Sequence, residues 1–479
     1  MTPPPQARPD SPSGSPLPAL LMGLLLGLSI LKLGNPVILE DQIGQPSGLA
    51  EWISRPWPTR TGLVLLPIVI ASLLFLTPWR QRLASARLPG WIWAAMAVWL
   101  GWQVASTAQT VDSRLTHLTL PHLISIAVCF IGGIILGAGR WKPVLIGLGT
   151  GACLCWLQAV NQRTVEFRAA RDALILGQQS GWTNISPAEL TDLRMSGLVI
   201  QTNGIDVANP AILDKLQRGR VHGSLVYPNA LAGLVLLTLP VLGVALVTTR
   251  SRLRPVLFYG ILALFCALGL ASLLWSGSRS GWLLALAVAA SAILLHPSLR
   301  RFRLPIALAV LLVGGGAFGL RNRDYFRKGA TSVAARFDYW KAALQNTAAH
   351  PVLGSGPGTF MRPYARLKAP DAEMARLVHN DFLQQFSDSG VPGGVAYLVW
   401  VLGSVGLAWY RLRTSPNPVL VTALLLGVSA WLAQGLSEFS LYVPPLAWTA
   451  FTLLGIAIGL PRVSPSTPSP HPTSLSPRP

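Results

Sequence analysis

The sequence predicts an all-α polytopic membrane protein, and three observations support this prediction. Of the 479 residues, 51% are hydrophobic and only 12% are charged, against roughly 25% charged in an ordinary soluble domain. Apolar stretches long enough to cross a bilayer recur along the chain. The basic residues gather in alternate connections between these stretches. A net charge of +20 alone would also suit a nucleic-acid-binding protein, but the mean hydropathy of +0.48 favours a membrane.

Twelve stretches of about 20 mostly apolar residues predict about 12 transmembrane helices. They lie near residues 17–35, 61–78, 91–109, 118–138, 143–160, 229–248, 256–275, 280–296, 304–320, 391–410, 418–436 and 443–460. The first lacks a convincing small-residue cleavage site, so we expect a retained span, with a signal peptide as the alternative. The tails at 1–16 and 461–479 are rich in Pro and Ser and are expected to be disordered.

The distribution of charge predicts how the chain is oriented. If both termini are cytoplasmic, 16 Lys and Arg residues fall on the cytoplasmic side and four in short outer loops, as expected because cytoplasmic loops hold an excess of basic residues. Of the 18 acidic residues only Asp10 is then cytoplasmic. Two long segments, 161–228 and 321–390, lie outside and are expected to fold against the membrane. Any chemistry is therefore expected on the outer face.

Two residues at the outer membrane surface are candidates for chemistry. Arg279 follows the seventh stretch in a very short turn, and an unpaired arginine near a bilayer is costly and often functional. The alternative is an arginine that snorkels at the interface. His379 is expected on the apolar face of a helix, where burial can tune a histidine for proton transfer. The alternative is a hydrogen-bonded core histidine without a catalytic role.

A third candidate, Arg336, borders an apolar stripe on a predicted helix of the second outer segment. The stripe consists of Val333, Phe337, Trp340 and Leu344. Arg336 is therefore expected along the membrane-facing surface, with an exposed arginine packed on Trp340 as the alternative.

Other features do not favour a metal, a disulfide or a cofactor. The four cysteines fall within predicted spans, and their spacing suits neither a disulfide framework nor a zinc site. Asp371 and Glu373 form the one close acidic pair of the second outer segment, which favours a solvated loop over a cation site. The glycine-rich turn 354–358 lacks the lysine and the strand–helix context of a P-loop, which leaves at most an anion site of backbone N–H groups.

Six short segments follow one another along the chain: VYPNALA (226–232), SGSRSG (276–281), RFDYW (336–340), HPVLGSG (350–356), HNDFLQ (379–384) and SGVPG (389–393). Taken together in this order, they resemble the O-antigen ligase family, which includes O-antigen polymerases and related protein-glycosylating enzymes. The resemblance covers roughly residues 220–460.

The resemblance implies a GT-C-like helical membrane enzyme that needs no metal or cofactor and does not bind nucleic acid. Such an enzyme transfers a glycan, with inversion, from undecaprenyl diphosphate to an acceptor hydroxyl at the outer, periplasmic face of the bacterial inner membrane. The acceptor is the lipid A core, another glycan or a protein. Arg279 and Arg336 match the essential arginines of the family and would bind the diphosphate. His379 matches its histidine and would act as the catalytic base.

Four further residues are expected to support the site: Asn229, Trp340, Asn380 and Asp388, the last of which stands where the family usually has glutamate. A polymerase that joins lipid-linked repeats is the nearest alternative function. A lipid-linked oligosaccharide transporter would share the twelve spans, but Lys32 is the one clear charge within a span, which disfavours ion coupling. A structural scaffold would not require the cluster of Arg279, Arg336 and His379.

Overall fold

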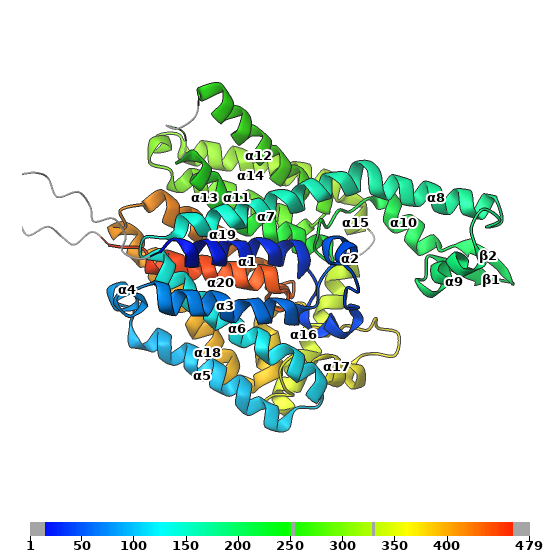
Figure 1. Ribbon diagram of the computed structural model, residues 1–479, viewed down its shortest axis with the longest axis horizontal. Helices are drawn as coiled ribbons and strands as arrows, with labels where there is room; N and C mark the ends of the chain where they lie inside the picture. Colours follow the sequence, from blue (N-terminus) through cyan, green and yellow to red (C-terminus); the bar gives the residue numbers. More distant parts are fainter. Residues whose placement is uncertain (1–14, 249, 251–253, 328–330, 463–479) are drawn as a thin grey trace, which may run out of the picture.

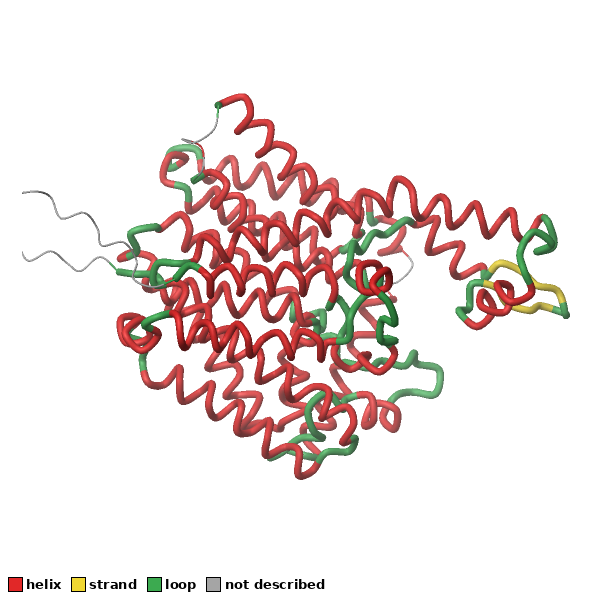
Figure 2. Tube along the Cα trace, viewed as in Figure 1, coloured by secondary structure: helices red, strands yellow, loops and turns green. Residues whose placement is uncertain are grey.

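Long, roughly parallel helices make up most of the chain (Figures 1 and 2). The computed structural model describes residues 15–248, 250, 254–327 and 331–462. The expected tails therefore lie outside the described residues except for 15–16 and 461–462. Three of the 16 basic residues assigned to the cytoplasmic side, Arg8, Arg252 and Arg478, lie outside them as well.

Each of the twelve predicted stretches coincides with a helix. These helices are α1 (Leu17–Lys32), α3 (Thr59–Leu76), α5 (Gly90–Ala105), α6 (Ser113–Gly137), α7 (Trp141–Asn161), α11 (Pro228–Val247), α12 (Pro255–Ser276), α13 (Arg279–Leu295), α14 (Arg303–Arg321), α18 (Asp381–Arg411), α19 (Pro418–Gln434) and α20 (Pro444–Gly459). Among the described residues, seven helices are long and apolar enough to cross a membrane, and four further apolar helices, α1, α13, α19 and α20, are shorter. The all-α polytopic class is confirmed, while a count of about 12 spans stays a prediction.

Close helix packing places α20 at the centre of the bundle, where all of its residues are buried. It packs most extensively against α6, and α1 packs against α7. In both pairs glycines spaced four apart meet: Gly133 and Gly137 lie against α20, and Gly147 and Gly151 lie against α1. Such small residues let helix backbones approach closely, which stabilises helix pairs in a bilayer, where the hydrophobic effect between helices is weak.

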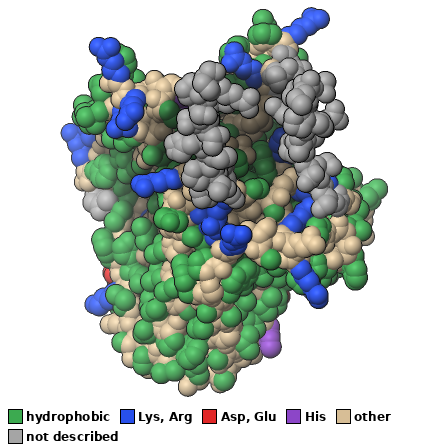
Figure 3. Space-filling view, turned by 90° about the vertical axis from the view of Figure 1, so that its left-hand side faces the viewer, with side chains coloured by type: hydrophobic (Ala, Val, Ile, Leu, Met, Phe, Trp, Pro, Cys, Tyr) green, Lys and Arg blue, Asp and Glu red, His purple; other side chains and the backbone are tan. Residues whose placement is uncertain are grey.

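Further helices lie at both ends of the bundle. One end carries η1 (Val37–Gln42), α2 (Leu49–Ser54), η2 (Ser106–Gln109), α15 (Arg323–Arg327), α16 (Thr331–Ala349), α17 (Met361–Leu367) and η7 (Ser440–Tyr442), and the other carries α4 (Trp79–Ala86), η5 (Pro297–Leu299) and η6 (Leu412–Thr414). The second end displays many Lys and Arg side chains and almost no Asp or Glu (Figure 3). The predicted orientation, with this end in the cytoplasm, accounts for that separation.

The first outer segment extends away from the bundle instead of folding against the membrane (Figure 1). α7 continues through the π-helical turn η3 (Gln162–Glu166) into α8 (Phe167–Gln179), and the segment ends with α9 (Pro187–Met195), the strands β1 (Val199–Thr202) and β2 (Ile205–Ala208), and α10 (Pro210–Arg218). The strands form an antiparallel hairpin. Asn203 and Gly204 both have positive φ, as a two-residue hairpin turn requires. This hairpin is the exception to the helical prediction.

The second outer segment packs onto the bundle through contacts between α16 and α18. α16 ends just before His350 and Pro351. α18 is broken at Ser389 and Gly390, where the glycine has a φ of +68° and lies against the carbonyl groups of residues 351 and 352. The outer part of α18 and the end of α16 therefore form one surface over the bundle.

Candidate active site

Glu438 lies at the centre of a polar cluster at the outer end of the bundle. It follows α19 and is only 1% exposed. Its Oε1 accepts hydrogen bonds from Arg336 Nη2 at 2.6 Å and from Asn229 Nδ2 at 2.7 Å. A buried carboxylate persists only with such partners, because its desolvation is otherwise unfavourable. Glu438 was not predicted from the sequence. The feature that could have indicated it is an acidic residue in a short loop between two apolar stretches.

His379 faces the other oxygen of Glu438. Its Nδ1 lies 3.8 Å from Glu438 Oε2, and neither atom, although buried, has a hydrogen-bond partner among the described residues. The ring contacts Tyr339 and Phe439, with centroids 5.6 Å and 4.7 Å away. About a quarter of the side chain, 28%, is exposed. The ring therefore points one nitrogen at a buried carboxylate while part of it reaches the surface.

The prediction that His379 belongs to a helix is wrong. α18 begins at Asp381, and the side chain of Asn380 caps it by accepting hydrogen bonds from the N–H groups of Phe382 and Leu383. His379 itself has a φ of +52°. A residue other than glycine rarely adopts this left-handed conformation, and such residues concentrate at functional sites.

Arg336 points inward to the cluster from α16, and not along the membrane-facing surface. Its Nε donates to the Ser437 carbonyl at 2.8 Å and its Nη1 to the Ser332 carbonyl at 3.0 Å. Together with the bond to Glu438, these use three of its five N–H donors, so two are left for a ligand. The side chain is 17% exposed, which leaves an edge of the guanidinium accessible.

Arg279 lies in the first turn of α13, directly after its N-cap residue Ser278. Its guanidinium stacks over the ring of Tyr325, with the central carbon 3.4 Å from the ring centroid. Nε donates to Asn322 Oδ1 at 3.2 Å, whereas neither Nη group has a hydrogen-bond acceptor among the described residues. Arg279 lies close enough to Arg336 for their charges to repel each other.

A third arginine, Arg220, joins the cluster from the segment before α11. Its Nε donates to the Ser276 carbonyl at 2.8 Å and its Nη2 to Asn229 Oδ1 at 3.0 Å. Burial and the positive charge of Arg279 lower the pKa of Arg220, while Glu438 opposes this shift. Arg336 and Arg220 thus lie near the Glu438 carboxylate, and Arg279 lies near both of these arginines. The surplus positive charge suits an anionic ligand. Arg220 was not predicted from the sequence, because it precedes VYPNALA (226–232), the first of the family-like segments.

Comparison with known proteins identifies this region. Residues 262–398 match the model of a protein family described as O-antigen ligase. This part of the chain is similar to the O-antigen ligase family. The match includes Arg279, Arg336 and His379 but ends before Glu438 and begins after Arg220. No curated protein matches the chain. The chain is therefore a multi-pass membrane protein with an O-antigen ligase domain, and this family implies a glycosyltransferase-like enzyme that acts on a lipid-linked glycan and an acceptor.

Three of the expected supporting residues adjoin the polar cluster around Glu438. Asn229 bridges Arg220 and Glu438, as described above. Trp340 donates from Nε1 to the His379 carbonyl at 3.4 Å. Asn380 is the N-cap of α18 and thereby places His379 outside the helix.

Asp388, the fourth expected supporting residue, faces a different part of the O-antigen ligase domain. It is fully buried and accepts hydrogen bonds from Tyr442 Oη at 2.6 Å, from Gly358 N at 2.8 Å and from Gln384 Nε2 at 2.8 Å. It therefore ties the glycine-rich turn to α18 and η7. The carboxylate that faces His379 is Glu438.

The glycine-rich turn differs from expectation, whereas the apolar stripe is largely exposed. The N–H groups of Gly354, Ser355, Gly356 and Gly358 all donate to acceptors within the protein, so they do not form an open anion site. Along α16 the exposed large apolar side chains are those of Val333, Phe337 and Leu344, whereas the buried face includes Tyr339, Ala342, Ala343, Asn346 and Thr347. Most of the stripe thus faces outward, and the buried face packs on α18. In the described part of the chain, no three His, Cys, Asp or Glu side chains are grouped as metal ligands.

Proposed function

We propose that this protein is a GT-C-like, metal-independent, inverting glycosyltransferase that transfers a glycan from undecaprenyl diphosphate to an acceptor hydroxyl at the outer face of the inner membrane. The observation that supports this most is the pair of unpartnered buried atoms, His379 Nδ1 and Glu438 Oε2, beside three arginines. A base and an anion-binding group are the two things that such a transfer requires.

In this proposal the arginines bind the diphosphate. Arg279 contributes the unpartnered Nη groups of a guanidinium held in place by Tyr325 and Asn322. Arg336 contributes its two remaining N–H donors. As the bond between the anomeric carbon and the diphosphate oxygen breaks, negative charge grows on the leaving group, and charge-assisted hydrogen bonds from arginine stabilise that charge.

His379 acts as the base. If Nδ1 carries its proton toward Glu438, then Nε2 has a free lone pair with which to accept the proton of the acceptor hydroxyl. The acceptor oxygen forms its bond to the anomeric carbon on the side opposite the leaving diphosphate, which inverts the configuration. The separation of 3.8 Å from Glu438 is longer than a hydrogen bond, and contacts of this kind commonly shorten when substrate binds.

The test is glycan transfer by the purified full-length protein in nanodiscs. The donor is an undecaprenyl-diphosphate glycan, and the acceptors are lipid A core, a protein and a second lipid-linked repeat. Formation of an inverted glycosidic bond, read by NMR of the product, supports the proposal, and the acceptor used separates a ligase from a polymerase. Retention of configuration contradicts it. Failure of all three acceptors, combined with movement of the donor across a liposome membrane, would favour the transporter.

A further inference from the structure

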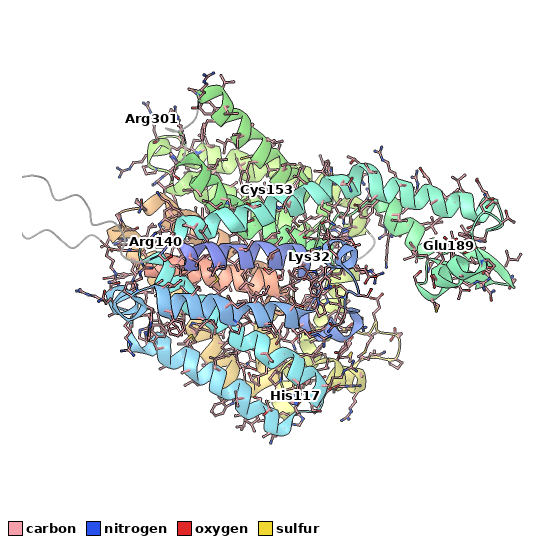
Figure 4. All side chains as sticks on the ribbon, viewed as in Figure 1. Lys32, His117, Arg140, Cys153, Glu189 and Arg301 are labelled. Atoms are coloured by element: carbon pink, nitrogen blue, oxygen red, sulfur yellow. The ribbon has the colours of Figure 1, made fainter. Side chains whose placement is uncertain are left out.

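A cavity of about 540 Å³ lies at the outer end of α1, on the far side of the segment that carries Arg220 and Asn229. Its walls are the end of α1, α2, the outer end of α7 and residues 222–226. Lys32, labelled in Figure 4, marks its position at the outer end of α1. The volume lies within the range of ~300–1,000 Å³ that is usual for small-molecule sites.

Three polar groups from three parts of the chain line this cavity without a protein hydrogen-bond partner among the described residues. They are the side-chain amides of Asn35 and Gln158 and the Nε2 atom of His222. His222 Nδ1 lies 2.5 Å from the Leu225 carbonyl, so Nδ1 carries the proton and Nε2 is an acceptor. Burial lowers the pKa of His222, which favours the neutral ring.

The chemistry of the lining suits an uncharged ligand rich in hydroxyl groups. The two amides offer donors and acceptors, and the neutral imidazole offers an acceptor. Leu31, Ile53 and Pro56 supply apolar surface for the C–H faces of a sugar ring. The Lys32 ammonium donates to the carbonyl groups of Ile53 and Arg55, which leaves one of its three N–H donors for a ligand hydroxyl group.

One short stretch of backbone separates this cavity from the arginine cluster. Residues 222–226 form a wall of the cavity, while Arg220 and Asn229, on either side of them, hydrogen-bond to each other in the cluster. The wall is fixed to the outer end of α1, because Ser224 Oγ donates to the Ile30 carbonyl at 2.7 Å. A ligand in the cavity would therefore lie beside the proposed diphosphate site without occupying it.

We propose that this cavity binds sugar residues of the acceptor and so positions the acceptor hydroxyl for transfer. The proposal rests on the proposed function, since it assigns the second substrate of the same reaction. It adds a site built from α1, α7 and the segment before α11, of which none falls within the 262–398 match.

The test fills the cavity with Gln158→Trp. Gln158 is exposed and its side chain makes no hydrogen bond with the described residues, so the larger side chain occupies the cavity without breaking a side-chain hydrogen bond. Gln179→Trp is the matched control, because Gln179 is also exposed and lies at the end of α8 on the same helical run, outside the cavity. Asn35→Ala is a second variant that removes a hydrogen-bonding group and adds no bulk. Thermal unfolding of each variant checks that it folds.

Two readouts are measured on the full-length protein. At saturating donor, Gln158→Trp should raise the KM for the acceptor at least tenfold, with kcat and the KM for the donor unchanged, and Gln179→Trp should match the wild type. In saturation-transfer NMR with a soluble core oligosaccharide as the probe, signals should weaken for Gln158→Trp and Asn35→Ala only. An unchanged acceptor KM and unchanged NMR signals for Gln158→Trp would overturn the proposal, as would a loss confined to kcat or to the donor KM.

The two proposals can fail separately. If the wild type transfers glycan to no acceptor, the proposed function fails, yet the NMR measurement still decides whether the cavity binds a saccharide. If the wild type transfers glycan but Gln158→Trp behaves like Gln179→Trp in both readouts, the cavity proposal alone fails.

Discussion

At the scale of single residues, two members of the cluster are held in states that cost free energy. The left-handed backbone of His379 is unfavourable by about 1–3 kcal/mol for a residue other than glycine. Glu438 is buried with one oxygen unpartnered. The Asn380 cap and the hydrogen bonds from Arg336 and Asn229 hold these two residues in place. Residues in such unfavourable local states are common at active sites and ligand-binding sites.

His379→Ala should lower kcat by about 10²–10⁴-fold, the usual contribution of a general base. The KM for the donor should change little, because the arginines remain. The measurement is steady-state transfer in nanodiscs. His379→Gly should be equally inactive but at least as stable toward heat as the wild type, since glycine adopts a positive φ without strain. Full activity of either variant would remove His379 as the base.

Glu438→Gln should impair both activity and stability. The amide keeps the shape of the side chain but removes the charge that faces His379 and pairs with Arg336. Removing one partner of a buried ion pair typically costs about 3–5 kcal/mol, so thermal unfolding should shift to lower temperature and kcat should fall at least tenfold. Glu373→Gln, in the exposed loop, is the control and should match the wild type. A Glu438→Gln variant as active as the wild type would contradict a role beside His379.

At the scale of helices, glycines decide how closely α1 approaches α7. A Cβ atom on Gly151 would lie 2.5 Å from the Cα of Gly27, whereas one on Gly149, on the same helix, would meet a Leu242 methyl group at 3.4 Å. The first distance leaves no space for a methyl group and the second is an ordinary contact. Alanine substitutions at these two positions therefore distinguish the effect of close helix packing on stability from the effect of helix propensity.

Gly151→Ala should destabilise the protein by roughly 1–3 kcal/mol, the usual cost of overpacking. Gly149→Ala should be neutral or stabilising, because alanine is favoured over glycine in a helix by about 1 kcal/mol. Thermal unfolding in detergent compares the two. Equal shifts for both variants would show that the contact between α1 and α7 does not depend on these glycines.

At the scale of the whole molecule, charge separates the two ends of the bundle. The end with α4, η5 and η6 displays Lys and Arg (Figure 3), and the opposite end carries the cluster and the projecting segment with its hairpin (Figure 1). If the basic end is cytoplasmic, the cluster faces the side on which the proposed acceptor is found.

Cysteine labelling in intact cells tests this orientation. Gln201→Cys in β1 should react with a membrane-impermeant maleimide, whereas Ser298→Cys in η5 should react only after the cells are lysed, because both positions are exposed but lie at opposite ends. The wild type, whose four cysteines lie within helices, serves as the blank. Labelling of Ser298→Cys in intact cells would reverse the predicted orientation.

The sequence predicted the apolar helices more completely than the candidate site. Helices that cross a bilayer must satisfy their own backbone hydrogen bonds and expose apolar side chains, so composition and length alone locate them. Glu438 gave no such periodic signal, and its partner Arg336 lies 102 positions earlier in the chain. The helical prediction for His379 failed because it followed the apolar pattern and overlooked Asn380 as a cap, which starts the helix two residues later.

Sequence alone was enough to predict the membrane class, the positions of the apolar helices and the family resemblance, because each of these depends on composition or on short local motifs. The folded structure was needed to show that Glu438 joins Arg336 to His379, that Asp388 faces the glycine-rich turn and that a cavity adjoins the cluster. Those contacts join side chains from helices far apart in the chain, and helix packing, set largely by close glycine contacts, brings them together.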